Sequence, residues 1–169
     1  MQTRLLTIAC MAALALATTG CGGTTRKANL YADVGATQIR ETRSYIIVLN
    51  IVPPEHMYQP AVAAKVHPTE GEFILQGLMG PIHADSRHFE AHVYSQTTGK
   101  PMYGRKVTVE VVDHTSNRTY PIKMTQMQDV VVGPPDFHYG NNADLPAGDS
   151  YSITVKVDGE ATVFNLKLV

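Results

Sequence analysis

The stretch SYSITVKVDGEATVFNLKL, residues 150–168, indicates the fold most directly. It contains two runs in which apolar or β-branched residues alternate with polar ones, 150–157 and 161–168, and this alternation is typical of strands with one buried face. Asp158-Gly159, which lies between the runs, suits the two-residue turn of a β-hairpin because both central positions need positive φ angles. The stretch therefore predicts an antiparallel hairpin.

Five further runs of the same kind precede this hairpin, with turn residues such as Pro53-Pro54 and Ser116-Asn117 between them. They are YIIVLNIV (45–52), EFILQGL (72–78), HFEAHVYS (88–95), KVTVEVVD (106–113) and RTYPIKMTQM (118–127). The last two are close enough in sequence to predict a second hairpin. No stretch of ten or more residues keeps a helical period. Seven such strands predict an all-β protein, an immunoglobulin-like antiparallel β-sandwich.

The N-terminal residues have the features of an export signal. Arg4 precedes an apolar run at residues 5–17, which is shorter than the roughly 20 residues that a membrane-spanning helix needs. The following TTGC (18–21) is similar to a bacterial lipobox, so we expect lipidation of Cys21. Cleavage after ALA (15–17) is the alternative, and it would leave Cys21 as a free thiol.

The expected organisation is a signal peptide at residues 1–20, a lipid-anchored tether at 21–43 and one immunoglobulin-like domain at 44–169. The tether mixes Gly, Thr and charged residues, with room for a short edge strand near its end. We expect an exported, periplasmic protein that is attached to a bacterial membrane through its lipid.

Composition limits the chemistry of the exported domain. The chain has two cysteines, and Cys10 falls in the signal peptide, so the domain has no internal disulfide and no thiolate to offer a metal. The formal net charge is −1 and the sequence has no basic patch, which argues against nucleic acid as a partner. The sequence has no nucleophile motif or phosphate-binding loop either, so we expect a protein that is not an enzyme.

The stretch RHFEAHVYS, residues 87–95, places His88, Glu90 and His92 at alternate positions of an expected strand. Alternate residues share one face of a strand, so these side chains lie together while the apolar residues between them enter the core. In one interpretation, the polar face is solvated and incidental. In the other, His88 and Glu90 bind an ion, because imidazole with carboxylate suits ferrous iron, copper or zinc. The helical zinc-protease motif HExxH is absent.

A second group of metal-ligand residues surrounds a Gly-Pro-Pro loop. Met124 and Met127 precede the loop, and His138 follows it in FHYGNN (137–142). Thioether and imidazole groups are the ligands that remain for a copper ion where thiols are oxidised, although a methionine at a strand end is otherwise a core residue. Three histidines without such neighbours are expected at the surface: His56, His67 and His114.

Residues 45–157 resemble the periplasmic iron-transport accessory proteins. The resemblance rests on YIIVLNIVPPEHM (45–57), HFEAH (88–92), KVTVEVVDHTSNRTYPIKMTQM (106–127) and FHYGNN (137–142). The last of these is similar to the family's His-Tyr-Gly-x-Asn loop. The resemblance implies a homodimer of immunoglobulin-like sandwiches that binds a copper or iron ion beside an inner-membrane iron permease.

The resemblance also implies which residues bind the ion: His88, Glu90, His138 and Met127, with Met124 as an alternative thioether. The chain departs from the family pattern in its spacing, because His92 follows His88 by four residues instead of six and two residues separate the methionines instead of one. A register that uses His83 and Asp85 stays open. His83, His92 and Met124 are therefore a second set of candidate ligands.

Two functional hypotheses follow from the sequence. In the first, the protein is a periplasmic metal-binding lipoprotein that assists iron or copper uptake or handling. In the second, it is a structural or protein-interaction lipoprotein of immunoglobulin-like fold with no metal site. The first predicts that His88, Glu90 and His138 are neighbours at one end of the sandwich. It also predicts that metal affinity falls from about pH 7 to pH 5, because imidazoles of ordinary pKa near 6.5 take up protons there.

Overall fold

The computed structural model describes residues 38–80, 82–83, 86–147 and 149–168. The expected signal peptide, Cys21 and most of the expected tether lie outside the described residues, as does Asp85. Within the described part of the chain, no helix is long and apolar enough to cross a membrane.

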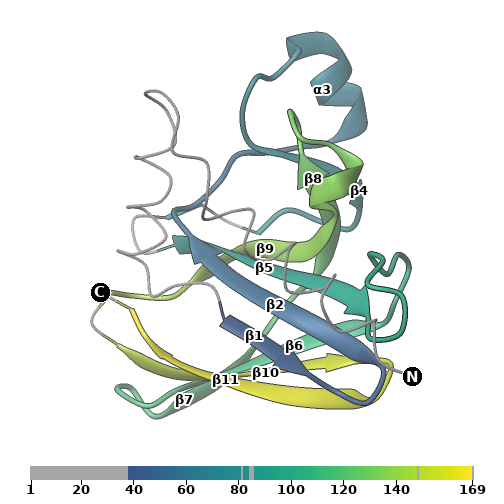
Figure 1. Ribbon diagram of the computed structural model, residues 1–169. Helices are drawn as coiled ribbons and strands as arrows, with labels where there is room; N and C mark the ends of the chain where they lie inside the picture. The colour runs from purple at the N-terminus through teal and green to yellow at the C-terminus, as the bar shows by residue number, and fades with distance from the viewer. Residues whose placement is uncertain (1–37, 81, 84–85, 148, 169) are drawn as a thin grey trace, which may run out of the picture.

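The described residues form two β-sheets (Figure 1). The larger sheet has the strand order β1-β2-β5-β9-β8-β4-β3, and the smaller has the order β11-β10-β6-β7. The strands of the larger sheet are β1 (Gln38–Glu41), β2 (Tyr45–Val52), β3 (Met57–Tyr58), β4 (Glu72–Gln76), β5 (Ser86–Ser95), β8 (Thr125–Asp129) and β9 (His138–Asp144). Those of the smaller sheet are β6 (Val107–Asp113), β7 (Arg118–Ile122), β10 (Ser150–Val157) and β11 (Glu160–Lys167). A helix, α3 (Pro60–Val66), follows β3, and a 3₁₀ turn, η1 (Pro134–Asp136), precedes β9.

The two sheets enclose one main core of apolar side chains. The larger sheet contributes Ile47 and Phe89, and the smaller contributes Val111, Ile153 and Phe164, all of them fully buried. Most strand pairs are antiparallel, and the short pair β3–β4 is parallel. The prediction of an all-β, immunoglobulin-like antiparallel sandwich is confirmed.

The C-terminal hairpin forms as its sequence predicts. Strands β10 and β11 pair from Ser150↔Lys167 to Val157↔Glu160, so only Asp158 and Gly159 remain in the turn. Their φ angles are 47° and 97°, the positive values that this tight turn requires. The run that begins at residue 106 also pairs with the run that begins at residue 118, as β6 and β7.

Three segments differ from the sequence-based expectation: 118–127, 138–144 and 60–66. The run 118–127 is two strands, because the chain crosses from the small sheet to the large one between Ile122 and Thr125. The segment 138–144, expected as a loop, is the central strand β9, paired with β5 on one side and β8 on the other. The segment 60–66 forms the short helix α3. Residues 38–41, near the end of the expected tether, form the edge strand β1, in agreement with the short edge strand that the sequence allowed there.

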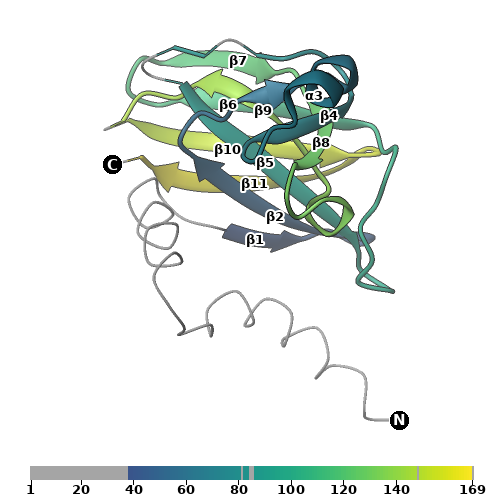
Figure 2. The ribbon, with the colours of Figure 1, turned by 90° about the horizontal axis from the view of Figure 1, so that it is seen from above.

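The larger sheet curls over one of its own faces. Figure 1 shows β8 and β4 rising above β9 and β5 with α3 beyond them, and in Figure 2, seen from above, α3, β4 and β8 lie over this part of the sheet. The face of β5 that points away from the core is consequently covered as well. His88, Glu90 and His92 on this face are only 0%, 6% and 7% exposed, so the interpretation as a solvated strand face is wrong.

Candidate metal centre

Two neighbouring strands carry the histidines of the covered face. The register of β5 and β9 pairs His88 with Asn142 and Glu90 with Gly140, which brings His138 of β9 beside His92 of β5. The ring centroid of His138 lies 5.8 Å from that of His88 and 5.0 Å from that of His92. The strand pairing alone therefore gathers three imidazoles that are far apart in sequence.

The curl of the sheet adds a carboxylate from a more distant strand. Glu72 begins β4, which is separated from β9 by β8, and its Oε2 lies 3.7 Å from His138 Nε2. The side chain of Glu72 is 3% exposed and that of His138 is fully buried. Glu72, His88 and His138 each offer a ligand atom within 4.8 Å of the others.

The hydrogen bonds of Asn142 fix which nitrogen of His88 carries a proton. Asn142 Nδ2 donates to the carbonyl oxygen of Glu55 at 2.9 Å, and Asn142 Oδ1 accepts from the backbone N–H of Glu55 at 3.2 Å. The amide oxygen therefore faces His88 Nδ1, 3.0 Å away, and this nitrogen must donate. The lone pair of neutral His88 is then on Nε2, which is how a supporting hydrogen bond orients a metal-binding histidine.

His138 is held in the same tautomeric form by its own backbone neighbour. Its Nδ1 lies 2.8 Å from the carbonyl oxygen of Asp136, which can only accept a hydrogen bond. Neutral His138 therefore keeps its proton on Nδ1 and presents the lone pair of Nε2 toward Glu72.

Several buried polar atoms of this face have no hydrogen-bond partner among the described residues. They are His88 Nε2, His138 Nε2, Glu72 Oε2, His92 Nδ1 and Asn50 Oδ1. An unsatisfied buried polar atom costs about 1–3 kcal/mol, so a cluster of them calls for an explanation. His138 Nε2 and Glu72 Oε2 face each other at 3.7 Å, too far apart for a hydrogen bond. Together with His88 Nε2 they are two imidazole nitrogens and a carboxylate oxygen, a donor set that suits a transition-metal ion.

Glu90 lies on the same face but is already engaged. Its Oε2 accepts a hydrogen bond from Asn50 Nδ2 at 2.9 Å and lies 3.3 Å from His92 Nε2. Burial by itself raises the pKa of this carboxyl, but the His92 contact and the charge of His138 outweigh it and lower the pKa below its usual range. Glu90 therefore supplies a buried negative charge beside the imidazoles.

Burial and neighbouring charges set the protonation of the three closest donors. Burial lowers the pKa of His88 to about 4, so His88 is neutral at pH 7. Burial raises the pKa of Glu72 to about 8. Burial also acts to lower the pKa of His138, but the hydrogen bond with Asp136 and the charges of Glu90 and Glu72 raise it to about 9. His88 is thus in the form that can bind an ion, whereas the raised pKa values of Glu72 and His138 mean that protons compete with an ion for these two groups.

Gly140 leaves room for this arrangement. It faces Glu90 across the strand pair, and an added Cβ would lie 2.5 Å from the carbonyl oxygen of Phe89 and 3.0 Å from His138 Cδ2. A larger residue would therefore displace the His138 ring.

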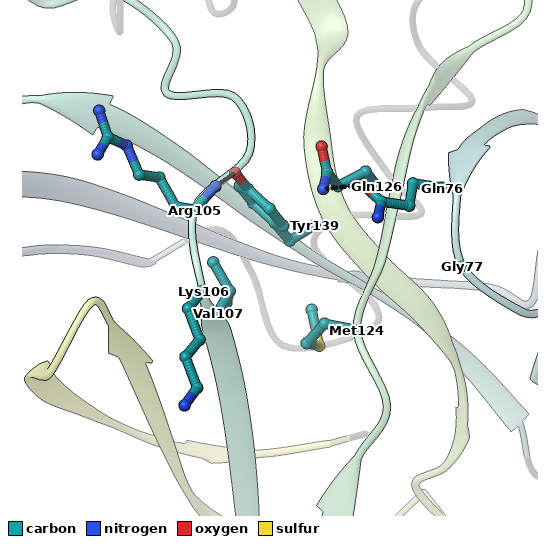
Figure 3. A pocket seen from close by; sticks show the side chains of 8 residues that line it. All are labelled: Gln76, Gly77, Arg105, Lys106, Val107, Met124, Gln126 and Tyr139. Carbon is teal, nitrogen blue, oxygen red and sulfur yellow. Dashed lines mark hydrogen bonds between the residues drawn. The ribbon is translucent and has the colours of Figure 1, made fainter.

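The remaining sequence-predicted candidates lie in different places. Met127 is fully buried on β8, directly paired with His138, and packs with Met57 and Ile74. Met124 instead packs against the main core and lines a separate cavity of about 270 Å³ between the two sheets (Figure 3). His83 is exposed in the segment before β5. The structure thus brings His88, Glu90, His92, Met127 and His138 to one face, without Met124 or His83.

Sequence reasoning missed Glu72, Asn142 and Asp136. Glu72 alternates with Ile74 at the start of β4, so it shares the inward face of an otherwise apolar strand. A charged residue on the buried face of a strand indicates a candidate site residue, so Glu72 could have been found from the sequence. The three surface histidines of the sequence analysis are all exposed.

The comparisons with known proteins support the fold. No protein-family model matches the chain, and no curated protein matches its sequence. The structure is similar to that of as-isolated FetP from uropathogenic Escherichia coli strain F11, expressed in the periplasm of E. coli, with 12% identity, a TM-score of 0.56 and coverage of 80% of this chain and 95% of FetP. It is also similar to a copper-bound glutamate-to-glutamine variant of FetP, with 11% identity, a TM-score of 0.56 and coverage of 80% and 98%. The chain therefore shares the immunoglobulin-like sandwich fold of FetP, which confirms at the level of the fold the resemblance predicted from its sequence.

Proposed function

We propose that this protein is a periplasmic metal-binding protein that takes up a copper or iron ion at the covered face of the larger sheet. The proposal rests on three residues, Glu72, His88 and His138, whose ligand atoms lie within 4.8 Å of one another. In each of them a buried side-chain atom has no hydrogen-bond partner in the part of the chain that the structure describes: His88 Nε2, His138 Nε2 and Glu72 Oε2. Buried polar atoms without hydrogen bonds are costly unless a ligand completes them. The hydrogen bond at Nδ1 leaves Nε2 as the ligand atom of each histidine; neutral His88 already presents a lone pair there, and His138 presents one once it loses its second proton.

The chemistry of the donors suits both metals. Two imidazoles with a carboxylate are typical ligands of ferrous iron and of the cupric ion, and a nearby thioether favours the cuprous ion. Met127, paired with His138 on the neighbouring strand, is the candidate thioether. Glu90 contributes negative charge that offsets the charge of the ion. The structural similarity to a copper-bound form of FetP supports this assignment.

The proposal includes the setting expected from the sequence. A signal peptide and lipidation at Cys21 would hold the protein at a bacterial membrane, where it would hand its ion to an inner-membrane iron permease. A homodimer is part of the same proposal. No catalytic step is assigned to the protein, because the donor set requires none.

Metal content after periplasmic expression tests the proposal. The full-length protein, expressed with copper or iron in the medium, should retain about one ion per chain by elemental mass spectrometry. His88→Ala should lower the affinity at least a hundredfold, because it removes a ligand whose lone pair is already exposed to the site. His114→Ala, in the exposed turn between β6 and β7, is the control and should retain the ion. Metal-free parent protein, or unchanged binding by His88→Ala, would favour the interaction-module hypothesis.

A further inference from the structure

A second donor set lies on the solvent side of the proposed metal site. His92, Asp136 and His138 each offer a ligand atom within 4.8 Å of the others. His92 is on β5, two residues beyond Glu90, and Asp136 is the last residue of η1. We call Glu72, His88 and His138 the inner set, and His92, Asp136 and His138 the outer set.

His138 separates the two sets because its two ring nitrogens face different carboxylates. Its Nε2 lies 3.7 Å from Glu72 Oε2, and its Nδ1 lies 3.5 Å from Asp136 Oδ2. The imidazole of His138 therefore lies between two carboxylates, Glu72 on one side and Asp136 on the other. An ion bound by one set is only one ring away from the other.

Exposure distinguishes the two sets. The Asp136 side chain is 30% exposed, whereas those of Glu72 and His138 are 3% and 0% exposed. His92 lies between these extremes at 8%, and the half-buried Tyr94 stacks on its ring at a centroid distance of 6.4 Å. An ion arriving from solvent would meet Asp136 before any member of the inner set.

His92 also has a ring nitrogen that could bind an ion. Its Nε2 contacts Glu90 Oε2, an oxygen that also accepts from Asn50, so this nitrogen donates. The lone pair of neutral His92 is then on Nδ1, which is buried and has no hydrogen-bond partner among the described residues. This nitrogen is therefore the ligand atom that His92 has available for the outer set.

The outer set must bind an ion less tightly than the inner set. His138 Nδ1 already donates to the carbonyl oxygen of Asp136 at 2.8 Å, and binding an ion there would break this bond. His138 Nε2 has no such bond to lose. We propose that His92, Asp136 and His138 form a transient outer site at which a divalent cation, cupric or ferrous, first binds before it reaches the inner set. This inference rests on the proposed metal binding at the inner set.

The loading rate of the parent protein tests the inference. Stopped-flow quenching of tyrosine fluorescence by cupric ion follows loading, and a competing chelator gives the equilibrium affinity. Asp136→Asn keeps the acceptor for the backbone N–H of Asp129 but removes the charge. It should slow loading and release at least tenfold each, while the dissociation constant changes less than threefold. Glu110→Gln, exposed on β6 of the other sheet, is the matched control for loss of one negative charge and should load at the parent rate.

A variant that lacks one ligand of the inner set provides a second test of the inference. His88→Ala should keep a weak cupric site, which Asp136→Asn in the same chain should abolish. If Asp136→Asn loads like the parent, or if the weak site of His88→Ala is insensitive to Asp136→Asn, the outer site does not exist. If the parent binds neither cupric nor ferrous ion, the proposed function itself fails, and that outcome is distinct from the other two.

Discussion

The pKa values of His138 and Glu72 are both raised, and we expect this to link metal binding to proton release. The pKa of His138 is raised to about 9 because Asp136, Glu90 and Glu72 outweigh its burial, and burial raises the pKa of Glu72 to about 8. A metal ion needs both groups deprotonated. Binding at pH 7 should therefore release about two protons, one from each group.

Calorimetric titration with cupric ion in buffers of different ionisation enthalpy measures this number. The affinity should rise between about pH 6 and pH 9, by about tenfold per pH unit for each proton that is displaced. Glu72→Gln should release about one proton fewer and bind at least tenfold more weakly, since it also removes a ligand. Proton release that is unchanged in Glu72→Gln would show that Glu72 does not bind the ion.

This pH dependence corrects the expectation from sequence. The ordinary imidazole pKa predicts proton competition between about pH 7 and pH 5 at both His88 and His138. Burial lowers the pKa of His88 to about 4, whereas the carboxylates around His138 raise its pKa. Alternation along 87–95 was enough to place His88, Glu90 and His92 on one face. The shifts depend on residues from β4 and η1, and no spacing in the sequence reveals those neighbours.

Strand β4 shows that the candidate site needs more than one strand, because its residue Glu72 lies beside His88 of β5 and His138 of β9. Its inward face carries Glu72 at the site and Ile74, which packs with Met57 and Met127 in a small apolar cluster separate from the main core. This cluster, together with the pairing of β4 with β8 and β3, packs the curled edge of the larger sheet over the histidines. The position of Glu72 therefore depends on the packing of Ile74.

Ile74→Ala should consequently affect both stability and metal binding. Removing a fully buried isoleucine side chain typically lowers the free energy of unfolding by about 2–5 kcal/mol. We also expect weaker cupric binding, because β4 carries Glu72. Leu75→Ala, on the opposite face of the same strand and 45% exposed, is the matched control and should change stability by less than about 0.5 kcal/mol. Urea unfolding followed by circular dichroism checks the first effect, and equal destabilisation by the two variants would contradict it.

The strands β8 and β9 show where sequence patterning fails. The segment HYGNNAD was expected as a loop because its residues are polar and turn-forming, yet it is the central strand β9. Its polar residues are buried with hydrogen-bond partners: Asn142 accepts from His88, and Asn141 donates to the backbone carbonyls of Leu78 and Lys123. Hydrophobic alternation detects strands that bury apolar faces, as β10 and β11 do. A strand whose covered face is built from imidazoles and amides gives no such signal.

At the scale of the whole molecule, two carboxylates join the sheets at the end where β2 begins. Glu160 of β11 accepts from the backbone N–H of Ser44 at 2.9 Å and from its hydroxyl at 2.7 Å, next to the first strand residue of β2. Tyr45 of β2 donates its hydroxyl proton to Asp158, in the turn between β10 and β11, at 2.8 Å. Both contacts connect the larger sheet to the C-terminal hairpin of the smaller one.

These contacts should make the sandwich less stable in acid. The hydrogen bonds from Ser44 are the main reason that the pKa of Glu160 is lowered to about 2, from an ordinary value of 4.5. A carboxyl whose pKa is lower in the folded state stabilises the fold above its unfolded pKa, and this contribution is lost as pH falls through the folded pKa. The hydrogen bonds from Tyr45 and the Lys106 backbone lower the pKa of Asp158 in the same direction.

Glu160→Gln isolates this effect, because a neutral amide cannot titrate. The parent should be more stable than the variant at pH 7, and the difference in free energy of unfolding should shrink steadily between about pH 5 and pH 2. Urea unfolding at a series of pH values measures the difference directly. Ser44→Ala removes the shorter of the two hydrogen bonds and should weaken the same pH dependence, while adding little to Glu160→Gln, because both changes act on one interaction. A stability difference that stays constant down to pH 2 would mean that Glu160 joins the sheets through contacts that do not need its charge.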